Sequence, residues 1–200
     1  MTSGGTGPVV VAGSTVEGEE PEVLQAFRRV LATNANSVLI LAPRHPERFP
    51  EVAALLTSSS IPFWQRSKWN TSDPVSGGVF LLDTIGELGA IYQLGDIAFV
   101  GGSLAQRGGH NILEPAMYGV PVLVGPHTEN FRDIIELFRR ADAVTIVRDC
   151  NELANKFDHL LADPQKRREL GDRAAELVRD QSGATLRTLD AIESLLHSVE

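Results

Sequence analysis

Short apolar runs recur along the whole chain, and each has the length of a β-strand. They are rich in valine, isoleucine and leucine, and they are continuous rather than alternating with polar positions. Continuous runs of this kind are typical of strands that are buried on both faces of a sheet. Seven strands are predicted, at residues 9–12, 38–41, 62–64, 79–82, 97–100, 122–124 and 144–147.

Helical periodicity fills the intervals between these runs. Apolar residues between 24 and 31 follow helical spacing behind the acidic segment 19–22, whose negative charge complements a helix N-terminus. The last fifty residues are helical in pattern, with Asp163 as an N-cap and Pro164 at the first helical position. We expect this tail to cover the sheet or to reach another domain. Further helices are predicted at residues 49–58, 87–94, 112–118 and 130–140.

The alternation of strands and helices predicts an α/β fold, a Rossmann-like doubly wound parallel sheet with helices on both faces. Residues 1–7 are small and polar and are predicted to be a disordered, tag-like tail, whereas residues 8–200 form one domain that ends in the helical tail. Because the first apolar run follows this tail at once, we expect the chain to be part of a longer protein. Ligands of such sheets bind at the carboxyl ends of the strands, so the segments that follow the strands are the candidates for chemistry.

Composition narrows the classes of partner. The chain has 18 basic and 26 acidic residues, a formal net charge of −8, and lacks the basic footprint that nucleic-acid binding requires. Its single cysteine cannot form an internal disulfide, which favours a reducing compartment. The N-terminus has no signal-peptide pattern, and no apolar run approaches the roughly 20 residues that span a bilayer. The chain is therefore expected to be soluble, with any membrane link peripheral or in sequence outside it.

Hydroxyls, prolines and arginines follow the first two strands. Ser14 and Thr15 lie directly before a helix, where backbone N–H groups can bind an anion, and an ordinary capped turn is an equally good interpretation. Pro43 and Arg44 follow the second strand, and the Arg44 guanidinium can bind a phosphate through two hydrogen bonds. Arg48, farther along this loop, is expected to be solvated.

A glycine opens the helix after the fourth strand. Ile85, Gly86 and Glu87 lie where the free N–H groups and the positive end of the helix dipole point into the presumed cleft. A phosphate fits there. In the alternative interpretation, Asp83 or Thr84 simply caps the helix.

The segment after the fifth strand, residues 101–115, is the richest in candidate chemistry. Two glycine pairs flank a short loop and allow close backbone approach and positive φ angles. The next helix presents Asn111 and Glu114 on one face, and a carboxylate there can accept two hydroxyl hydrogens from a ribose. The alternative is a glycine-rich connection with a surface glutamate.

Several chemistries lack their sequence signatures. There is no Gly-x-Gly-x-x-Gly after the first strand, no Walker-type Gly-Lys-Ser/Thr and no His-Glu-x-x-His. Ser14 lacks the Gly-x-Ser-x-Gly elbow of a nucleophile. The histidines are scattered, so no metal and no cofactor are predicted.

Together these segments resemble the Kdo transferases, which move 3-deoxy-D-manno-octulosonic acid (Kdo) from CMP-Kdo to lipid A precursors. The order and spacing of the matching pieces cover nearly the whole chain. Val16 departs from the pattern, because a histidine is expected there. The matching segments are 12–15 with 17–20, 43–49, 83–88, 99–104, 108–111 with 114–116, and 125–127 with 130–131.

The resemblance implies that the chain is the C-terminal, donor-binding half of a GT-B glycosyltransferase in lipopolysaccharide biosynthesis. Its partners would be CMP-Kdo, the N-terminal domain of the same protein and, through the full-length enzyme, a lipid A precursor. That N-terminal domain would supply a carboxylate general base for inversion without a metal, so no catalytic residue is expected in this chain and the isolated domain is expected to be inactive. The full-length enzyme would work at the cytoplasmic face of the bacterial inner membrane.

Two other functions remain open at this stage. One is a GT-B transferase or an epimerase that uses a UDP sugar. The other is a non-catalytic domain that binds a partner protein through its helical tail. The resemblance to the Kdo transferases implies that the donor would contact Ser14, Thr15, Pro43, Arg44, Ile85, Gly86, Glu87, Gly109, His110, Asn111, Ile112, Leu113 and Glu114.

Overall fold

The structure is a computed structural model that describes residues 7–70 and 73–197, with side chains as far as residue 181. The tail predicted at residues 1–7 lies outside the described residues except for Gly7. The N–H of Gly7 donates to the carbonyl of Asn36 at 2.9 Å.

Seven parallel strands form one sheet in the order β3-β4-β2-β1-β5-β6-β7, which confirms the predicted fold class. The chain runs outward from β1 through β2 to the β4–β3 edge and then returns to place β5 on the other side of β1. The order in which the chain adds strands to the sheet therefore reverses between β1 and β5. Ligands of such folds bind at the carboxyl ends of the strands at this point. The strands are β1 (Val9–Thr15), β2 (Val38–Pro43), β3 (Phe63–Gln65), β4 (Gly78–Leu81), β5 (Ile97–Val100), β6 (Val122–Val124) and β7 (Val144–Ile146).

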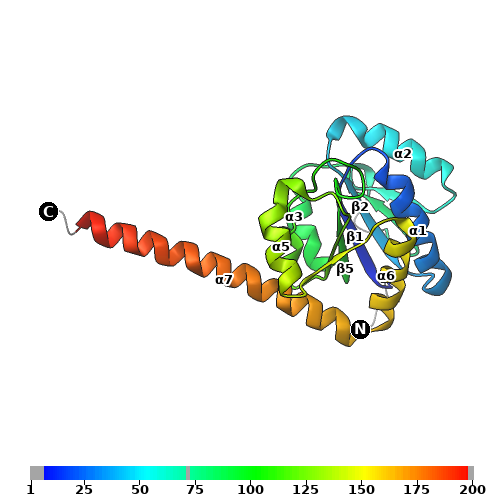
Figure 1. The fold of residues 1–200 in the computed structure, drawn as a ribbon. Coiled ribbons are helices and arrows are strands. Elements are labelled where there is room, and N and C mark those ends of the chain that lie inside the picture. The colour runs from blue at the N-terminus through cyan, green and yellow to red at the C-terminus, as the bar shows by residue number, and fades with distance from the viewer. Residues whose placement is uncertain (1–6, 71–72, 198–200) are drawn as a thin grey trace.

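Helices cover both faces of this sheet (Figure 1). The first face packs its alternate strand residues, such as Leu39 and Phe99, against α1, α2 and α6. The second face packs the intervening residues, such as Val11 and Val124, against the remaining elements. The helices are α1 (Glu19–Thr33), α2 (Phe49–Ser58), α3 (Leu88–Ile91), α4 (Leu113–Ala116), α5 (Arg132–Arg140), α6 (Cys150–Ala162) and α7 (Pro164–His197), with 3₁₀ turns at Pro46–Arg48, Arg66–Lys68, Tyr92–Leu94 and Glu129–Phe131.

Two predicted helices are shorter than expected. The pattern at 87–94 forms one turn of α-helix, α3, which tightens into a 3₁₀ turn and ends at Gly95. The pattern at 112–118 forms α4 and then closes with tighter bonds, in which the N–H of Gly119 donates to the carbonyl of Ala116 at 3.0 Å. Short helices leave part of the second sheet face to be covered by loops.

The last helix, α7, extends well beyond the rest of the domain (Figure 1). Asp163 caps it as predicted, because an oxygen of its side chain accepts the N–H of Lys166 at 2.9 Å. Leu170 and Ala174 are buried against the two faces of the domain, and Leu177 and Val178 still pack on the second face. The later part of the helix projects away from the sheet (Figure 1). Among the residues that the structure describes, no helix is both long and apolar enough to cross a membrane.

Candidate functional site

The carboxyl ends of β1, β2 and β4 surround a small pocket of about 90 Å³, here called the strand-tip pocket. Five of the residues predicted for the site line it, although they come from three separate loops. Its wall also includes Phe49 and Thr84. The predicted residues in its lining are Ser14, Pro43, Arg44, Ile85 and Gly86.

Backbone pairing holds the first two loops of this pocket together. The N–H of Arg44 donates to the carbonyl of Thr15 at 2.8 Å, just past a bulge in the β1–β2 ladder. Ser14 lies within that bulge with φ 55°. The exposed Arg44 side chain thus emerges from a fixed backbone beside the end of β1.

The third loop is open toward solvent. Gly86 has φ 86°, and the space where a Cβ would lie is empty. Ile85 is 78% exposed although it is apolar. Neither Asp83 nor Thr84 caps α3: Asp83 accepts the N–H of Ser67 at 2.8 Å, and the Thr84 hydroxyl donates to the Glu87 carboxylate at 2.6 Å. The capping alternative is therefore wrong.

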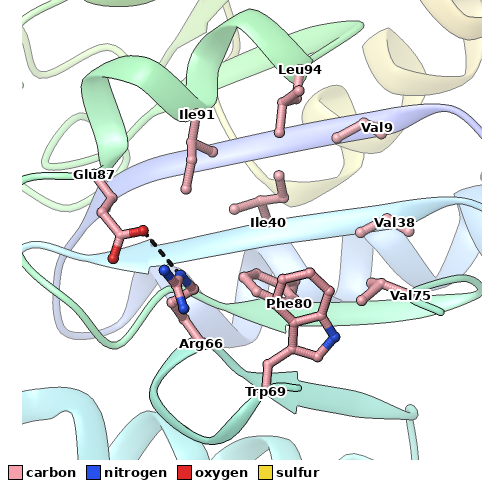
Figure 2. A pocket seen from close by; sticks show the side chains of 10 residues that line it. All are labelled: Val9, Val38, Ile40, Arg66, Trp69, Val75, Phe80, Glu87, Ile91 and Leu94. Carbon is pink, nitrogen blue, oxygen red and sulfur yellow. Dashed lines mark hydrogen bonds and ion pairs between the residues drawn. The ribbon is translucent and has the colours of Figure 1, made fainter. Parts of the chain in front are cut away.

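Glu87 faces away from the strand-tip pocket. Its carboxylate pairs with Arg66 at 2.9 Å, and the hydrogen bond from Thr84, followed by that from Arg66, lowers its pKa. This ion pair lies at one end of a second pocket, about 630 Å³ in volume, on the second face of the sheet (Figure 2). Val38, Ile40 and Phe80 contribute to its apolar lining.

The second pocket is roomier than the strand-tip pocket but chemically less suited to a nucleotide. Sites for polar ligands need a few converging polar groups. In this pocket, Arg66 and Glu87 are already paired with each other. Loops at the ends of parallel strands supply such groups. We therefore place the candidate site at the strand tips, where the available volume is smaller.

The segment after β5 bends as its glycines predicted, with Gly108 at φ 81° and Gly109 at φ 75°. The ring of His110 lies against Gly102, because a Cβ there would be 2.8 Å from its Nε2. Burial lowers the pKa of His110, and the positive charges of Arg44 and His45 lower it further. His110 is therefore close enough to Arg44 for its charge to act on the ring.

The side chains of Asn111 and Glu114 contact each other, as their spacing predicted, but α4 begins only at Leu113, so Asn111 precedes the helix instead of lying on its face. The Asn111 amide donates to a Glu114 oxygen at 3.3 Å, and its own oxygen accepts the N–H of Leu113 at 3.0 Å. The other Glu114 oxygen is 3.8 Å from the position that a Cβ on Gly89 in α3 would occupy. The turn that carries Glu114 is thus adjacent to α3, the helix that follows Gly86, and all three predicted clusters lie in segments that follow the carboxyl ends of strands.

At several predicted positions the side chain is buried, so that only the backbone could contact a donor. Thr15 and Ile112 are fully buried, and the Thr15 hydroxyl has no hydrogen-bond partner. Leu113 packs against the second-face core beside α5 and α7. Val16, which stands where a histidine was expected, is also buried, at 6% exposure.

The prediction that Arg48 is solvated is wrong. Its side chain is 13% exposed and binds Glu20 through two hydrogen bonds, at 2.6 and 3.1 Å. Glu20 and its neighbour Glu19 are both buried, although the sequence indicates only that segment 19–22 complements a helix N-terminus and that residues 17–20 match the Kdo transferase pattern. The sequence feature that could have indicated a role for them is their position just after the first strand, beside the point where the strand order reverses. Among the described residues, no group of three or more acidic, histidine or cysteine side chains could hold a metal.

The chain is similar to known glycosyltransferases. The model of the Glycosyl transferase-like family matches residues 87–190. The chain is 39% identical to a 3-deoxy-D-manno-octulosonic acid transferase of Haemophilus influenzae, over 94% of this chain and 44% of that protein. It is 37% identical to the Bordetella pertussis enzyme of the same name, over 97% of this chain and 46% of that protein. The chain thus spans slightly less than half the length of these relatives.

A solved structure extends the similarity to three dimensions. The C-terminal CMP-Kdo binding domain of WaaA from Acinetobacter baumannii aligns with a TM-score of 0.81 and 37% identity, over 86% of this chain and 90% of that one. Anabaena HepE in complex with UDP-glucose aligns with a TM-score of 0.59 at 17% identity, which shows a shared fold alone.

Proposed function

Because the chain belongs to the Glycosyl transferase-like family, among the C-terminal domains of the Kdo transferases, we propose that it is the donor-binding half of such an enzyme and holds CMP-Kdo at the strand tips. The observation that carries the proposal is that Arg44 and Gly86 line one pocket at the strand tips, while Glu114 lies beside α3, the helix that follows Gly86. Three loops far apart in the sequence supply them, and each carries a different kind of polar group.

Arg44 is the proposed partner of the phosphate. Its guanidinium is exposed at the end of β2 and lines the same pocket as Gly86, whose open backbone allows close approach. A guanidinium can bind two phosphate oxygens at once. As the sugar gains positive character and CMP departs, a fixed positive group stabilises the charge that builds on the phosphate.

Glu114 is the proposed partner of the ribose. The Asn111 amide holds one of its oxygens, at 3.3 Å, and so orients the carboxylate. A carboxylate oriented in this way can accept hydrogens from two neighbouring hydroxyls. Gly109 and His110 lead into this turn and complete that side of the site. Ser14, Pro43 and Ile85 would form the walls around the donor.

The rest of the reaction belongs to the proposed full-length enzyme. The acceptor would be a lipid A precursor in lipopolysaccharide biosynthesis at the cytoplasmic face of the inner membrane. An N-terminal domain would supply the general base for an inverting, metal-independent transfer. This chain would then contribute binding and electrostatic stabilisation but no catalytic residue, and would be inactive alone.

Titration of the ¹⁵N-labelled chain with CMP and with UDP tests the proposal. CMP is expected to shift the backbone resonances of Arg44, Gly86, Asn111 and Glu114, and to bind more tightly than UDP in calorimetry. No shift at these residues at millimolar CMP would contradict the proposal. Tighter binding of UDP would favour a transferase or an epimerase that uses a UDP sugar. Binding of neither nucleotide would favour a partner-binding domain.

A further inference from the structure

The first residue of α1 places a buried carboxylate between two loops. Glu19 is 1% exposed. One of its oxygens accepts the N–H groups of Val16 at 3.0 Å and Gly102 at 2.8 Å. The other accepts the three N–H groups of residues 103–105, at 2.9, 2.9 and 3.2 Å. Five backbone donors therefore surround one carboxylate.

These donors lie at the point where the strand order of the sheet reverses, between β1 and β5. Val16 follows β1 and Gly102 follows β5, and the two strands are neighbours. N–H groups gathered at such a point often bind the anion of a ligand. Here the carboxylate of Glu19 occupies them instead. A buried charge is tolerated only while its hydrogen bonds are complete, so this carboxylate fixes the loop after β5 in one conformation.

The fixed loop continues into the proposed donor residues. The carbonyl of Gly102 accepts the N–H of Gly109 at 2.7 Å. The His110 ring rests on the same glycine, since a Cβ on Gly102 would be 2.8 Å from its Nε2. Asn111 and Glu114 follow directly. A change at Glu19 therefore reaches the proposed ribose site through Gly102, without any contact between Glu19 and the donor.

The next residue does the same for the loop after β2. The Glu20 carboxylate is 1% exposed and binds Arg48, at 2.6 and 3.1 Å. The N–H of Arg48 donates to the carbonyl of His45 at 3.0 Å, which closes the turn directly behind Arg44. Two consecutive carboxylates on the first turn of α1 thus hold the loops on either side of β1.

We propose that Glu19 and Glu20 are positioning residues that hold the donor-binding loops in their binding conformation before the donor arrives. The proposal rests on the proposed function, because it concerns the loops that would hold CMP-Kdo. A site whose loops are already ordered loses less conformational entropy when the ligand binds, and so binds it more tightly. Neither residue touches the donor.

The test compares CMP binding by the unsubstituted chain and by its Glu19→Gln variant. The glutamine keeps one acceptor oxygen but turns its NH₂ group toward backbone donors, so the loop after β5 loosens. CMP affinity is expected to fall about tenfold in calorimetry at a temperature where circular dichroism shows the variant folded. In the free variant, the amide resonances of residues 102–105 and of Gly109 are expected to shift. Glu20→Gln is expected to weaken CMP binding with shifts at residues 44–48 instead.

The matched control is Val30→Ala, a fully buried position at the far end of the same helix. It should lower the melting temperature and leave CMP affinity unchanged, because it removes packing without touching the loops. Equal affinity of Glu19→Gln and the unsubstituted chain, with only the melting temperature reduced, would overturn the inference and leave the proposed function standing. No CMP binding by the unsubstituted chain would overturn both.

A measurement without substitutions covers the case in which Glu19→Gln does not fold. In the free, unsubstituted chain, hydrogen exchange at Gly102, Ser103 and Leu104 is expected to be as slow as in the neighbouring strand β5, because their N–H groups are held by Glu19. Exchange as fast as that of exposed loop amides, slowed only when CMP is added, would overturn the inference.

Discussion

The loops after β4 and β5 both carry glycines at the same edge of the sheet, yet the structure uses them in opposite ways. After β5, Gly101 is packed so closely that a Cβ would be 2.7 Å from a Glu19 oxygen, and the N–H groups that follow it bind that carboxylate. After β4, Gly86 faces empty space beside the exposed side chain of Ile85. A glycine at a strand tip marks close approach or freedom, and only its surroundings tell which.

The largest expected effect comes from adding a methyl group to each glycine in turn. Gly101→Ala should destabilise the domain by about 2–3 kcal/mol, because its Cβ would be 2.5 Å from the Ser14 carbonyl oxygen as well as near Glu19. Gly86→Ala meets no atom and should cost only about 1 kcal/mol for its positive φ. Urea unfolding of both variants measures the difference, and equal losses would break the comparison.

A second prediction concerns the charge at the open side. Arg44→Ala should weaken CMP binding about 10- to 100-fold, the range expected for hydrogen bonds to a charged group. The free energy of unfolding should change by less than about 0.5 kcal/mol, because Arg44 is exposed. The control is Arg140→Ala, an arginine of α5 that is 74% exposed and should leave CMP affinity intact. Similar affinities for the two variants, measured by calorimetry, would contradict the role given to Arg44.

The smallest expected effect is a pH dependence at His110, which belongs to the loop after β5 and packs on Gly102 of that loop. Burial and the charges of Arg44 and His45 hold its pKa below the usual value near 6.5. The unfolded chain therefore binds this proton more readily, so the contribution of His110 to stability is present above pH 6.5 and is lost as the pH falls below it. NMR titration of the His110 ring should find the low pKa, Arg44→Ala should raise it, and bound CMP should raise it too. If the pKa of His110 stays the same in Arg44→Ala and when CMP is bound, the His110 ring does not lie near Arg44.

Much of the fold could be predicted from the sequence, for reasons that particular residues show. The β5 run, Ile97–Val100, is fully apolar because helices or loops cover both faces of a parallel strand. The rule that ligands gather at the carboxyl ends of such strands brought Arg44 and Gly86 into one predicted site, and they line one pocket. The contact between Asn111 and Glu114 could be predicted from their spacing, although Asn111 precedes α4, which begins at Leu113.

The two buried glutamates and Arg48 could not be predicted in the same way. Local pattern treats a charged residue as solvated, and that expectation holds for most charged residues. The N–H groups that bind the Glu19 carboxylate lie as far as 86 positions along the chain. Glu20, which binds Arg48, lies 28 positions before it. No spacing rule connects such positions.

The sequence by itself determined the order of the strands and helices and the kinds of polar group that follow each strand, since these depend on short-range periodicity and residue type. The tertiary structure alone decided which backbone N–H groups the protein uses itself and which stay open to a ligand. The physical reason is that a buried charge is stabilised only by the complete set of its hydrogen bonds, and folding assembles that set from strands that are distant in the chain.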